Sequence, residues 1–260
     1  MSSPQKHPKT SGRPKKGASG TSAAKPLLVG AGIAVAAVLL GLASYQATAP
    51  ERSTESGATS VAQREQPTDA QRELSALARR DSGDPMARGR VDAPVVLIEY
   101  ADFRCGYCGK FARDTAPQLV EKYVENGTLR IEWRNYPIFG AESEAAAKAA
   151  WAAGRQGRFW EFHRAAFAED AKEKGFGERR LLELAGEAGV ADLARFKKDL
   201  GSTAAEQALA RDTGEGNRIG VTSTPSFLVN GQPLAGAQPL AAFERAIGAA
   251  KAAAGAAAAK

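Results

Sequence analysis

The chain contains two cysteines, Cys105 and Cys108, and only Gly106 and Tyr107 separate them. Two thiols at this spacing can close into a disulfide and open again. Such a bridge is a poor structural staple, because a loop of two residues removes little entropy from the unfolded chain and its tight ring is easily reduced. The spacing therefore favours a redox pair, which exchanges electrons with other thiols, over an inert disulfide.

Zinc binding and covalent haem attachment are other uses of a Cys-x-x-Cys pair. A structural zinc ion needs four ligands, and the sequence adds only His7, in a basic N-terminal tail, and His163. Haem attachment requires a histidine directly after the second cysteine, where Gly109 stands. We therefore expect no metal, and no cofactor beyond the redox-active disulfide of Cys105 and Cys108.

The two cysteines fall between a predicted strand and a predicted helix. The apolar run Pro94–Tyr100 predicts a buried strand, and helical spacing follows the cysteines up to Asn126-Gly127. Cys105 would lie at the start of the helix and Cys108 in its first turn, where unpaired N–H groups and the helix dipole stabilise an anion. We expect a Cys105 pKa below the usual value of about 8.5, with Arg104 adding positive potential.

These positions give the two sulfurs different roles. Cys105, reachable from solvent, would attack a substrate and form a mixed disulfide, and the less exposed Cys108 would resolve it. Gly106 would let a substrate backbone approach closely, and Tyr107 offers an apolar ring at the rim. The dipeptide has no histidine to donate a hydrogen bond to the thiolate, so we expect a less oxidising disulfide than a histidine-containing pair would form.

The surrounding sequence predicts an α/β domain that positions the pair. A second strand follows the helix, and strand, helix and strand together form a βαβ unit with parallel strands. An alanine-rich helical block comes next, then a hairpin at Asn230-Gly231 and a last amphipathic helix. The expected bounds are 94–100 and 128–137 for the strands, 142–217 for the helical block and 238–251 for the last helix.

The N-terminal part of the chain has the pattern of a membrane anchor. Residues 1–25 hold six Lys or Arg and no acidic residue, and Leu27–Tyr45 are almost entirely apolar. A helix of this length spans roughly 28 Å, close to the hydrocarbon thickness of a bilayer. Basic segments tend to stay inside the cell. We therefore expect a cytoplasmic tail at 1–25, a transmembrane helix at 26–47 and a catalytic domain outside the plasma membrane.

A cleaved signal peptide is the alternative, since the small residues Ala47–Ala49 could precede a cleavage site. The basic region and the apolar run are longer than usual for a signal peptide, and Pro50 would follow the cut. A buried core helix fits less well between a basic tail and a polar linker. A membrane anchor and a cleaved signal peptide would both place the main domain outside the cell, and cleavage would also release it from the membrane.

The charge balance argues against a nucleic-acid-binding domain. The six basic residues of the tail account for the net charge of +6, because the other 29 Lys and Arg equal the 29 Asp and Glu. A nucleic-acid-binding domain would carry a basic surplus of its own, so we expect no nucleic acid partner. Residues 48–85 are predicted to form a linker with one short amphipathic helix over 68–80, where Thr68 and Gln71 have capping-box spacing.

Over about residues 92–250 the chain resembles the DsbA-like branch of the thioredoxin superfamily. The segments that carry the resemblance are "VVLIEYADFRCGYCGKF" and "VTSTPSFLVNGQPLAGAQP". The chain looks similar to the membrane-tethered thiol-disulfide oxidoreductases of Gram-positive actinobacteria. The resemblance implies an α/β, thioredoxin-like domain at 86–251 with a helical insertion at about 141–217, a low-complexity tail at 252–260 and one N-terminal transmembrane helix.

The resemblance also implies three site assignments. Cys105 and Cys108 match the active-site pair. Thr224 and Pro225 match the residue and the cis-proline that face the disulfide and bind the substrate backbone. Glu99 matches the buried acid beneath the disulfide, which would have a raised pKa and could carry protons to and from Cys108.

The leading hypothesis for function is a single-pass membrane enzyme that forms disulfide bonds in exported proteins. Its substrates would be reduced exported polypeptides, a VKOR- or DsbB-like membrane protein would reoxidise it, and it would work as a monomer. A reductase or isomerase of the cell envelope and a non-catalytic peptide-binding module are the alternatives. Gly-Tyr stands where DsbA itself has Pro-His, which leaves the direction of electron flow open.

Overall fold

The computed structural model describes residues 68–259, which belong to one compact unit. The tail at 1–25, the membrane span expected at 26–47 and the first part of the linker lie outside the described residues. Between Thr68 and Ala259, no helix is both long and apolar enough to cross a bilayer. The domain expected at 86–251 lies entirely within the described part.

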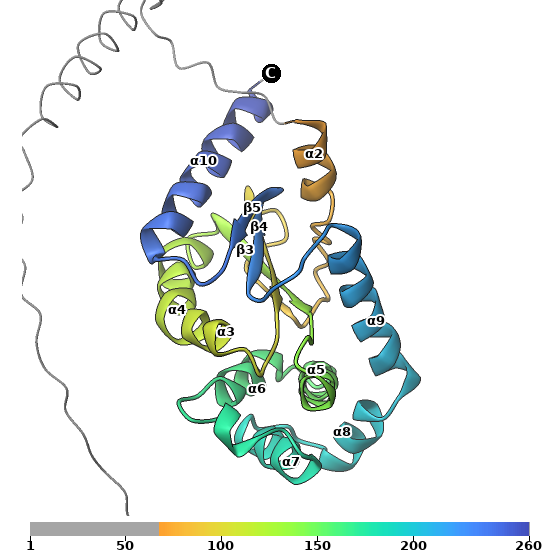
Figure 1. Cartoon of the computed structure of the whole chain (residues 1–260). Coiled ribbons are helices and arrows are strands. Elements are labelled where there is room, and N and C mark those ends of the chain that lie inside the picture. The colour runs from red at the N-terminus through yellow and green to blue at the C-terminus, as the bar shows by residue number, and fades with distance from the viewer. Residues whose placement is uncertain (1–67, 260) are drawn as a thin grey trace, which may run out of the picture. The chain divides into compact units, whose positions relative to one another are not determined.

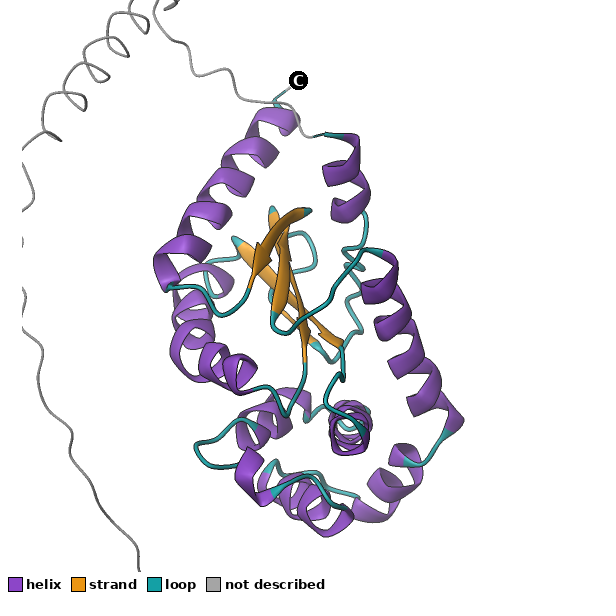
Figure 2. Ribbon diagram, in the orientation of Figure 1, coloured by secondary structure: helices purple, strands orange, loops and turns teal. Residues whose placement is uncertain are grey.

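Five strands form one mixed sheet. They are β1 Ala87–Arg88, β2 Val95–Ala101, β3 Leu129–Asn135, β4 Ser226–Val229 and β5 Gln232–Ala235. Their order is β1-β3-β2-β4-β5, and helices surround the sheet (Figure 2). β2 and β3 run parallel, which confirms the predicted βαβ unit, and β4 and β5 form the predicted hairpin. The short strand β1, which the sequence analysis did not predict, pairs antiparallel with β3.

The helix after β2 begins directly at the cysteines. Its four consecutive segments are α3 Gly106–Lys110, a π-helical stretch Phe111–Thr115, α4 Ala116–Leu119 and a second π-helical stretch Val120–Val124. The sequence predicts an ordinary α-helix here. The first π-helical stretch departs from it because Pro117 has no N–H to continue the i→i−4 ladder. The N–H of Ala116 bonds instead to the carbonyl of Phe111, five residues back.

A helical insertion lies between β3 and β4, as the resemblance implies. It consists of α5 Ala141–Gly154, α6 Phe159–Ala166, a short 3₁₀ turn Lys172–Lys174, α7 Glu178–Glu187, α8 Leu193–Leu200 and α9 Thr203–Arg218. Figure 1 shows α5 to α8 beyond one end of the sheet, while α9 runs along its side. Buried alanines of α5 and aromatic rings of α6 form much of the core between the insertion and the cysteines.

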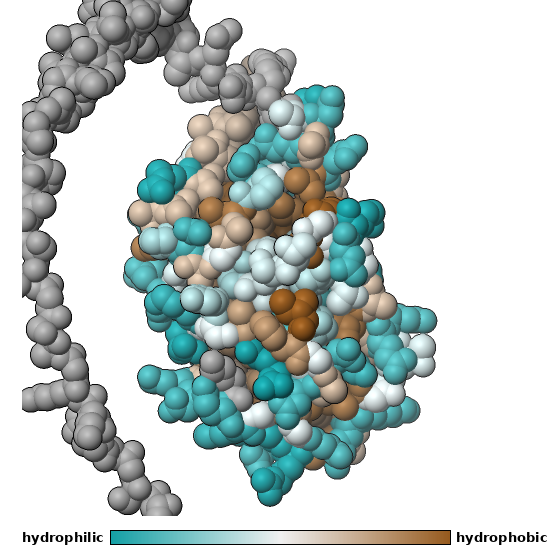
Figure 3. Space-filling model, viewed as in Figure 1, coloured by the Kyte–Doolittle hydropathy of each residue, from teal (hydrophilic) through white to brown (hydrophobic). Residues whose placement is uncertain are grey.

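Two terminal helices flank the hairpin, and both differ in length from the prediction. α2 spans Asp69–Ser75 and α10 spans Leu240–Ala258. α2 ends before residue 80 because the N–H groups of Arg79 and Arg80 bond to a carboxylate of β3. α10 continues to Ala258, past the end expected at residue 251, because alanine has the highest helix propensity. Apolar surface gathers between α2 and α10 (Figure 3), where alanines of α10 line a groove.

The polar side chains of β3 are buried in an ionic cluster. Glu132 is fully buried and accepts hydrogen bonds from Arg130 at 3.0 Å and from Arg134 at 2.9 Å. Arg134 also pairs with Glu215 of α9 at 2.9 Å, and Asp212 of α9 accepts the N–H of Asn135 at 3.1 Å. The cluster therefore ties α9, the last helix of the insertion, to the central sheet.

Candidate active site

Cys105 is the N-cap residue of α3, as the sequence predicts. Its sulfur accepts the N–H of Cys108 at 3.4 Å, and both cysteines are free thiols. Sulfur thus takes the place of the oxygen that usually caps a helix, and it receives the unpaired N–H groups of the first turn. The local backbone therefore favours negative charge on Cys105.

Asp102 holds the loop that presents Cys105, and the sequence analysis did not identify it. Its carboxylate accepts the N–H of Arg104 at 2.7 Å, and its carbonyl accepts the N–H of Cys105 at 3.0 Å. The same carboxylate accepts the N–H groups of Ile138 at 2.7 Å and Phe139 at 3.2 Å. An Asp two residues before a turn is a recognisable signal for the first contact, but the contacts after β3 depend on the fold.

Cys105 is less exposed than the sequence predicts, and Cys108 is the more buried of the two, as expected. Cys105 is 5% exposed and Cys108 is fully buried. Cys105 lines a cleft of about 230 Å³ together with Phe103, Gly106 and Phe167. The attacking sulfur is therefore reached through this cleft and does not stand free on the surface, because the neighbouring rings pack around it.

The two thiols differ in acidity, and each difference has a physical cause. The pKa of Cys105 is lowered to about 6, first by a hydrogen bond from the Cys108 thiol. Burial opposes this shift, and the side chain of Thr224 and first-turn N–H groups support it. The pKa of Cys108 is raised, mainly by burial and then by Cys105. At neutral pH Cys105 is therefore a thiolate and Cys108 a thiol.

The segment at Thr224 and Pro225 faces the cysteine pair. The Thr224–Pro225 peptide bond is cis, in agreement with the resemblance. The Cys105 thiol donates a hydrogen bond to the Thr224 carbonyl at 3.2 Å. The structure thus brings together residues that lie 119 positions apart in the chain.

Glu99 lies at the back of the pair, in the last part of β2. It is 3% exposed, and its Oε1 has no hydrogen-bond partner within residues 68–259. Burial, and to a smaller extent the charge of Cys105, raises its pKa to about 8. A neutral carboxyl at pH 7 beside the buried Cys108 thiol can give or take a proton when that sulfur changes charge.

Exposed apolar side chains lie next to the cysteine loop. Gly106 lines the cleft itself, and Tyr107, in the dipeptide between the cysteines, is 69% exposed. Ile138 and Phe139, which Asp102 holds beside the cysteine loop, are 42% and 50% exposed. Arg104 pairs with Glu142 of α5 at 3.4 Å. The sequence analysis named Tyr107 but not the two apolar residues that the loop after β3 adds.

Within residues 68–259, no group of three or more His, Cys, Asp or Glu is placed to hold a metal ion. His163 is buried among the rings of Trp133, Phe159, Trp160 and Phe167. The side chains of the site supply one acidic thiol, one buried thiol and one neutral carboxyl.

Comparison with known proteins gives matches over this same part of the chain. A family model described as Thioredoxin matches residues 81–249. A probable disulfide bond formation protein D of Bacillus cereus is 30% identical over 165 residues, which cover 59% of this chain and 76% of that protein. The crystal structure of oxidised BdbD from Bacillus subtilis has a TM-score of 0.60 at 22% identity and covers 65% of this chain and 94% of that chain.

A second kind of relative matches over a smaller share of its own length. The Na(+)/H(+) antiporter NhaA 1 of Salinispora arenicola is 34% identical over 164 residues, which cover 62% of this chain. The chain spans about a quarter of that antiporter, since the match covers 24% of it.

Proposed function

Because the chain belongs to the DsbA-like thiol-disulfide oxidoreductases of the thioredoxin superfamily, we propose that it forms disulfide bonds in exported polypeptides through Cys105 and Cys108. One observation carries this proposal. An acidic thiol caps a helix next to a buried thiol, with the neutral carboxyl of Glu99 behind them.

The exchange takes two steps that conserve electrons. A substrate thiolate attacks Cys105 of the oxidised pair, the S–S bond breaks, and its electron pair goes to Cys108, which takes up a proton. A second substrate thiolate then attacks the substrate sulfur of the mixed disulfide and releases Cys105 as a thiolate. The substrate gains a disulfide, and the enzyme holds two electrons on its two reduced cysteines.

The geometry supports a role for Thr224 and Pro225 in holding the substrate. The Thr224 carbonyl lies within hydrogen-bond distance of the reacting sulfur, so an extended substrate backbone placed there would bring its own sulfur to Cys105. Tyr107, Ile138 and Phe139 offer apolar contacts to the same substrate, and Gly106 leaves room for its backbone.

The expected setting is the outer face of the plasma membrane. The charge pattern of residues 1–45 supports a single-pass anchor with a cytoplasmic tail, as in the membrane-tethered actinobacterial enzymes that the chain resembles. A VKOR- or DsbB-like membrane protein would accept the two electrons. Membrane pelleting of the full-length chain and its resistance to carbonate extraction test the anchor, and a mature N-terminus after Ala49 would show cleavage instead.

Oxidation of a reduced dithiol peptide by the full-length chain tests the activity. We expect turnover with the wild-type chain and none with Cys105→Ser or Cys108→Ser, because neither variant can form the Cys105–Cys108 disulfide that oxidises the peptide. With the disulfide form of the peptide, the Cys105 thiolate of Cys108→Ser should form a mixed disulfide and release the other peptide thiol. Activity of Cys105→Ser at the wild-type rate would overturn the proposal, and unchanged peptide binding without turnover would indicate a peptide-binding module.

The reduction potential decides between an oxidase and a reductase or isomerase. The absence of a histidine between the cysteines favours a less oxidising pair, so the reductase remains a specific second candidate. A potential near about −270 mV, the value of thioredoxin, would support the reductase, and one well above it supports the oxidase.

A further inference from the structure

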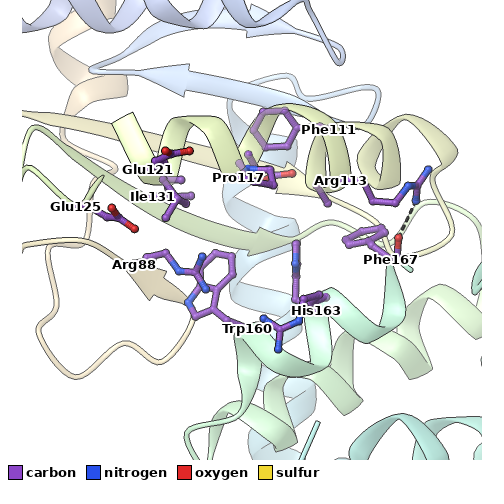
Figure 4. A pocket seen from close by; sticks show the side chains of 15 residues that line it. Arg88, Phe111, Arg113, Pro117, Glu121, Glu125, Ile131, Trp160, His163 and Phe167 are labelled. Carbon is purple, nitrogen blue, oxygen red and sulfur yellow. Dashed lines mark hydrogen bonds between the residues drawn. The ribbon is translucent and has the colours of Figure 1, made fainter. Parts of the chain in front are cut away.

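A second cavity lies between the helix that carries the cysteines and α6. It has a volume of about 430 Å³, within the range of about 300–1,000 Å³ that small-molecule sites commonly have. Apolar side chains form most of its walls, among them Phe111, Ile131 and Trp160. Figure 4 shows Phe111 and Pro117 on one side and Trp160 and His163 on the other. The cavity therefore has the size and the lining of a pocket for a small, mainly apolar molecule.

Two buried polar atoms line this cavity without a hydrogen-bond partner in the described part of the chain. They are Oε1 of Glu99 and Nε2 of His163, in residues that are 3% and 7% exposed. The ring of His163 projects into the space between the two helices in Figure 4. Burying an unpaired polar atom is unfavourable, and ligand pockets use such isolated polar groups to orient what they bind. The interior of the cavity therefore suits a ligand with a polar group.

Both of these side chains are neutral at pH 7. Burial raises the pKa of Glu99 to about 8, with a smaller contribution from the charge of Cys105. The pKa of His163 is lowered to about 3, first by burial and then by the charges of Arg88 and Arg164. A neutral carboxyl and a neutral imidazole can each donate one hydrogen bond and accept another. A hydroxyl group also donates and accepts, so it can pair with either of them.

Two arginines supply positive charge at the same cavity. Arg88 and Arg164 both line it, and neither has an ion-pair partner among the described residues. Arg88 lies over the Trp160 ring, 4.5 Å from its centroid. Burial and then the charge of Arg164 lower the pKa of Arg88, and Glu161 opposes this shift. An anionic group beside the two guanidinium groups would offset their mutual repulsion.

Acidic residues contribute to the lining too. Glu121 and Glu125 come from the end of the helix that carries the cysteines, and Arg113 from its first half adds a third guanidinium group. Three arginines and two glutamates leave a positive surplus around the cavity. This surplus favours an anionic ligand over a cationic one.

Arg113 and Phe167 form the wall between this cavity and the cleft at Cys105. Arg113 donates from Nη1 to the carbonyl of Phe167 at 2.7 Å, shown as the dashed line in Figure 4. Both residues line both spaces. A ligand in the cavity therefore occupies a space other than the one through which a client polypeptide reaches Cys105.

We propose that this cavity binds a small aromatic hydroxy acid, a flat apolar ring system with a carboxylate at one end and a hydroxyl at the other. The carboxylate pairs with Arg88 and Arg164. The rings lie against Trp160 and the apolar walls, and the hydroxyl bonds to Nε2 of His163. The inference goes beyond the proposed function, because binding here needs neither cysteine.

Equilibrium dialysis of 6-hydroxy-2-naphthoate against the full-length chain tests the proposal. This probe carries both polar groups, whereas 2-naphthol lacks the carboxylate and 2-naphthoate lacks the hydroxyl. We expect one hydroxynaphthoate per chain, with an affinity about tenfold above that of naphthol and about threefold above that of naphthoate. Equal affinities for the three probes would overturn the proposal, because they would indicate unspecific partition into apolar surface.

Arg164→Gln tests the contact with the carboxylate. It should weaken hydroxynaphthoate binding by about threefold and leave naphthol binding unchanged, since naphthol has no charge to lose a partner. Arg179→Gln is the matched control, because Arg179 is exposed on α7 and does not line the cavity. The control should bind as the wild type does. An equal loss for both probes in Arg164→Gln would contradict the charge pairing.

His163→Phe tests the contact with the hydroxyl, because it keeps a ring and loses Nε2. The advantage of hydroxynaphthoate over naphthoate, about threefold in the wild type, should disappear in this variant. Naphthoate binding reports whether the cavity itself is intact. An advantage that persists at its wild-type size would show that the hydroxyl does not bond to His163.

Ala116→Leu tests the place of binding, since Ala116 lines the cavity and the larger side chain takes the space of the rings. It should weaken all three probes by at least about tenfold. Gln118→Leu adds the same side chain to an exposed position of the same helix outside the cavity and should bind normally. Wild-type binding by Ala116→Leu would overturn the proposal. If Ala116→Leu does not fold, the exposed Arg164→Gln still decides.

Cys105→Ser separates this inference from the proposed function. It should bind hydroxynaphthoate as the wild type does, because the cavity does not include the reacting sulfur. A wild-type chain that never oxidises a peptide would end the proposed function and leave the cavity site standing. Absence of hydroxynaphthoate binding in an active chain would end the cavity site alone.

Discussion

The sulfur of Cys105 lies 3.2 Å from the carbonyl oxygen of Thr224. A thiol donates to this oxygen only while it is protonated, and at neutral pH Cys105 has lost its proton. The Thr224 carbonyl is then free to accept a backbone N–H from a polypeptide. Ionisation of Cys105 therefore also frees the Thr224 carbonyl to bind the substrate.

The acidity of Cys105 can be measured by its alkylation with iodoacetamide. The rate should rise with pH around a midpoint near 6, because the thiolate is the reacting form. In Cys108→Ala the midpoint should move upward, since the hydrogen bond from the Cys108 thiol is the largest cause of the shift. A wild-type midpoint near the ordinary value of about 8.5 would contradict the assigned role.

Glu99 should make the folded state less stable as the pH rises. Its pKa increases from an ordinary 4.5 to about 8 on folding, so the folded chain holds a proton that the unfolded chain releases. The free energy of unfolding should fall between these pH values, by at most roughly 5 kcal/mol. Urea denaturation of Glu99→Gln should lack this fall.

The comparison for Glu99 belongs in a Cys105→Ser background. The depressed pKa of Cys105 stabilises the folded state at high pH, and this opposite slope would mask the effect of the carboxyl. Parallel stability curves for Cys105→Ser with and without Glu99→Gln would show that Glu99 stays ionised.

Glu132→Gln should destabilise the domain by about 3–5 kcal/mol, because it leaves the buried guanidinium of Arg134 without one of its carboxylate partners. Although burial alone would raise it, the pKa of Glu132 is lowered to about 2 by N–H groups and arginines around it. The wild type should therefore lose this contribution as the pH falls below about 4.5, and Glu132→Gln should not.

Asp114→Asn is the control for this prediction. It removes the exposed ion pair with Lys110 and should leave the urea midpoint unchanged.

Gly231→Ala should release α2 from the hairpin. Gly231 and Gly220 share a φ of +78°, so alanine at either position incurs the left-handed penalty of about 1–2 kcal/mol. At Gly231 the new Cβ would also overlap the carbonyl of Gln71, whereas nothing lies within 4 Å at Gly220. Urea denaturation should show a further loss of about 1–3 kcal/mol for Gly231→Ala. Equal losses in the two variants would argue against tight docking of α2.

Local patterns predicted the redox pair of Cys105 and Cys108, and the family resemblance added Thr224 and Pro225, but neither identified Asp102, which holds the cysteine loop. The alternation of apolar and polar residues predicted β3. It did not predict that other segments of the chain bury the polar face of this strand. Arg130 and Glu132 look solvent-facing in a single strand. In the structure Arg130 bonds to the carbonyls of Asp81 and Gly89, and Glu132 accepts the N–H groups of Arg79 and Arg80, from a segment much earlier in the chain.

The position of His163 could not be predicted from the sequence either. His163 lies in α6, and its ring is buried. Its position in the same cavity as Glu99 depends on how α6 packs against the helix of the cysteines. No spacing in the sequence reports that contact.

The helical insertion is fastened to the sheet domain at both ends. α9 is tied to β3 by Asp212 and Glu215, and α6 is tied by the Trp160 bond to the Ala87 carbonyl and by the Arg113 bond to Phe167. A hinge-like swing of the whole insertion, a common way to widen a cleft, would have to break both fastenings. Client chains are therefore expected to bind while the insertion and the sheet keep their relative orientation.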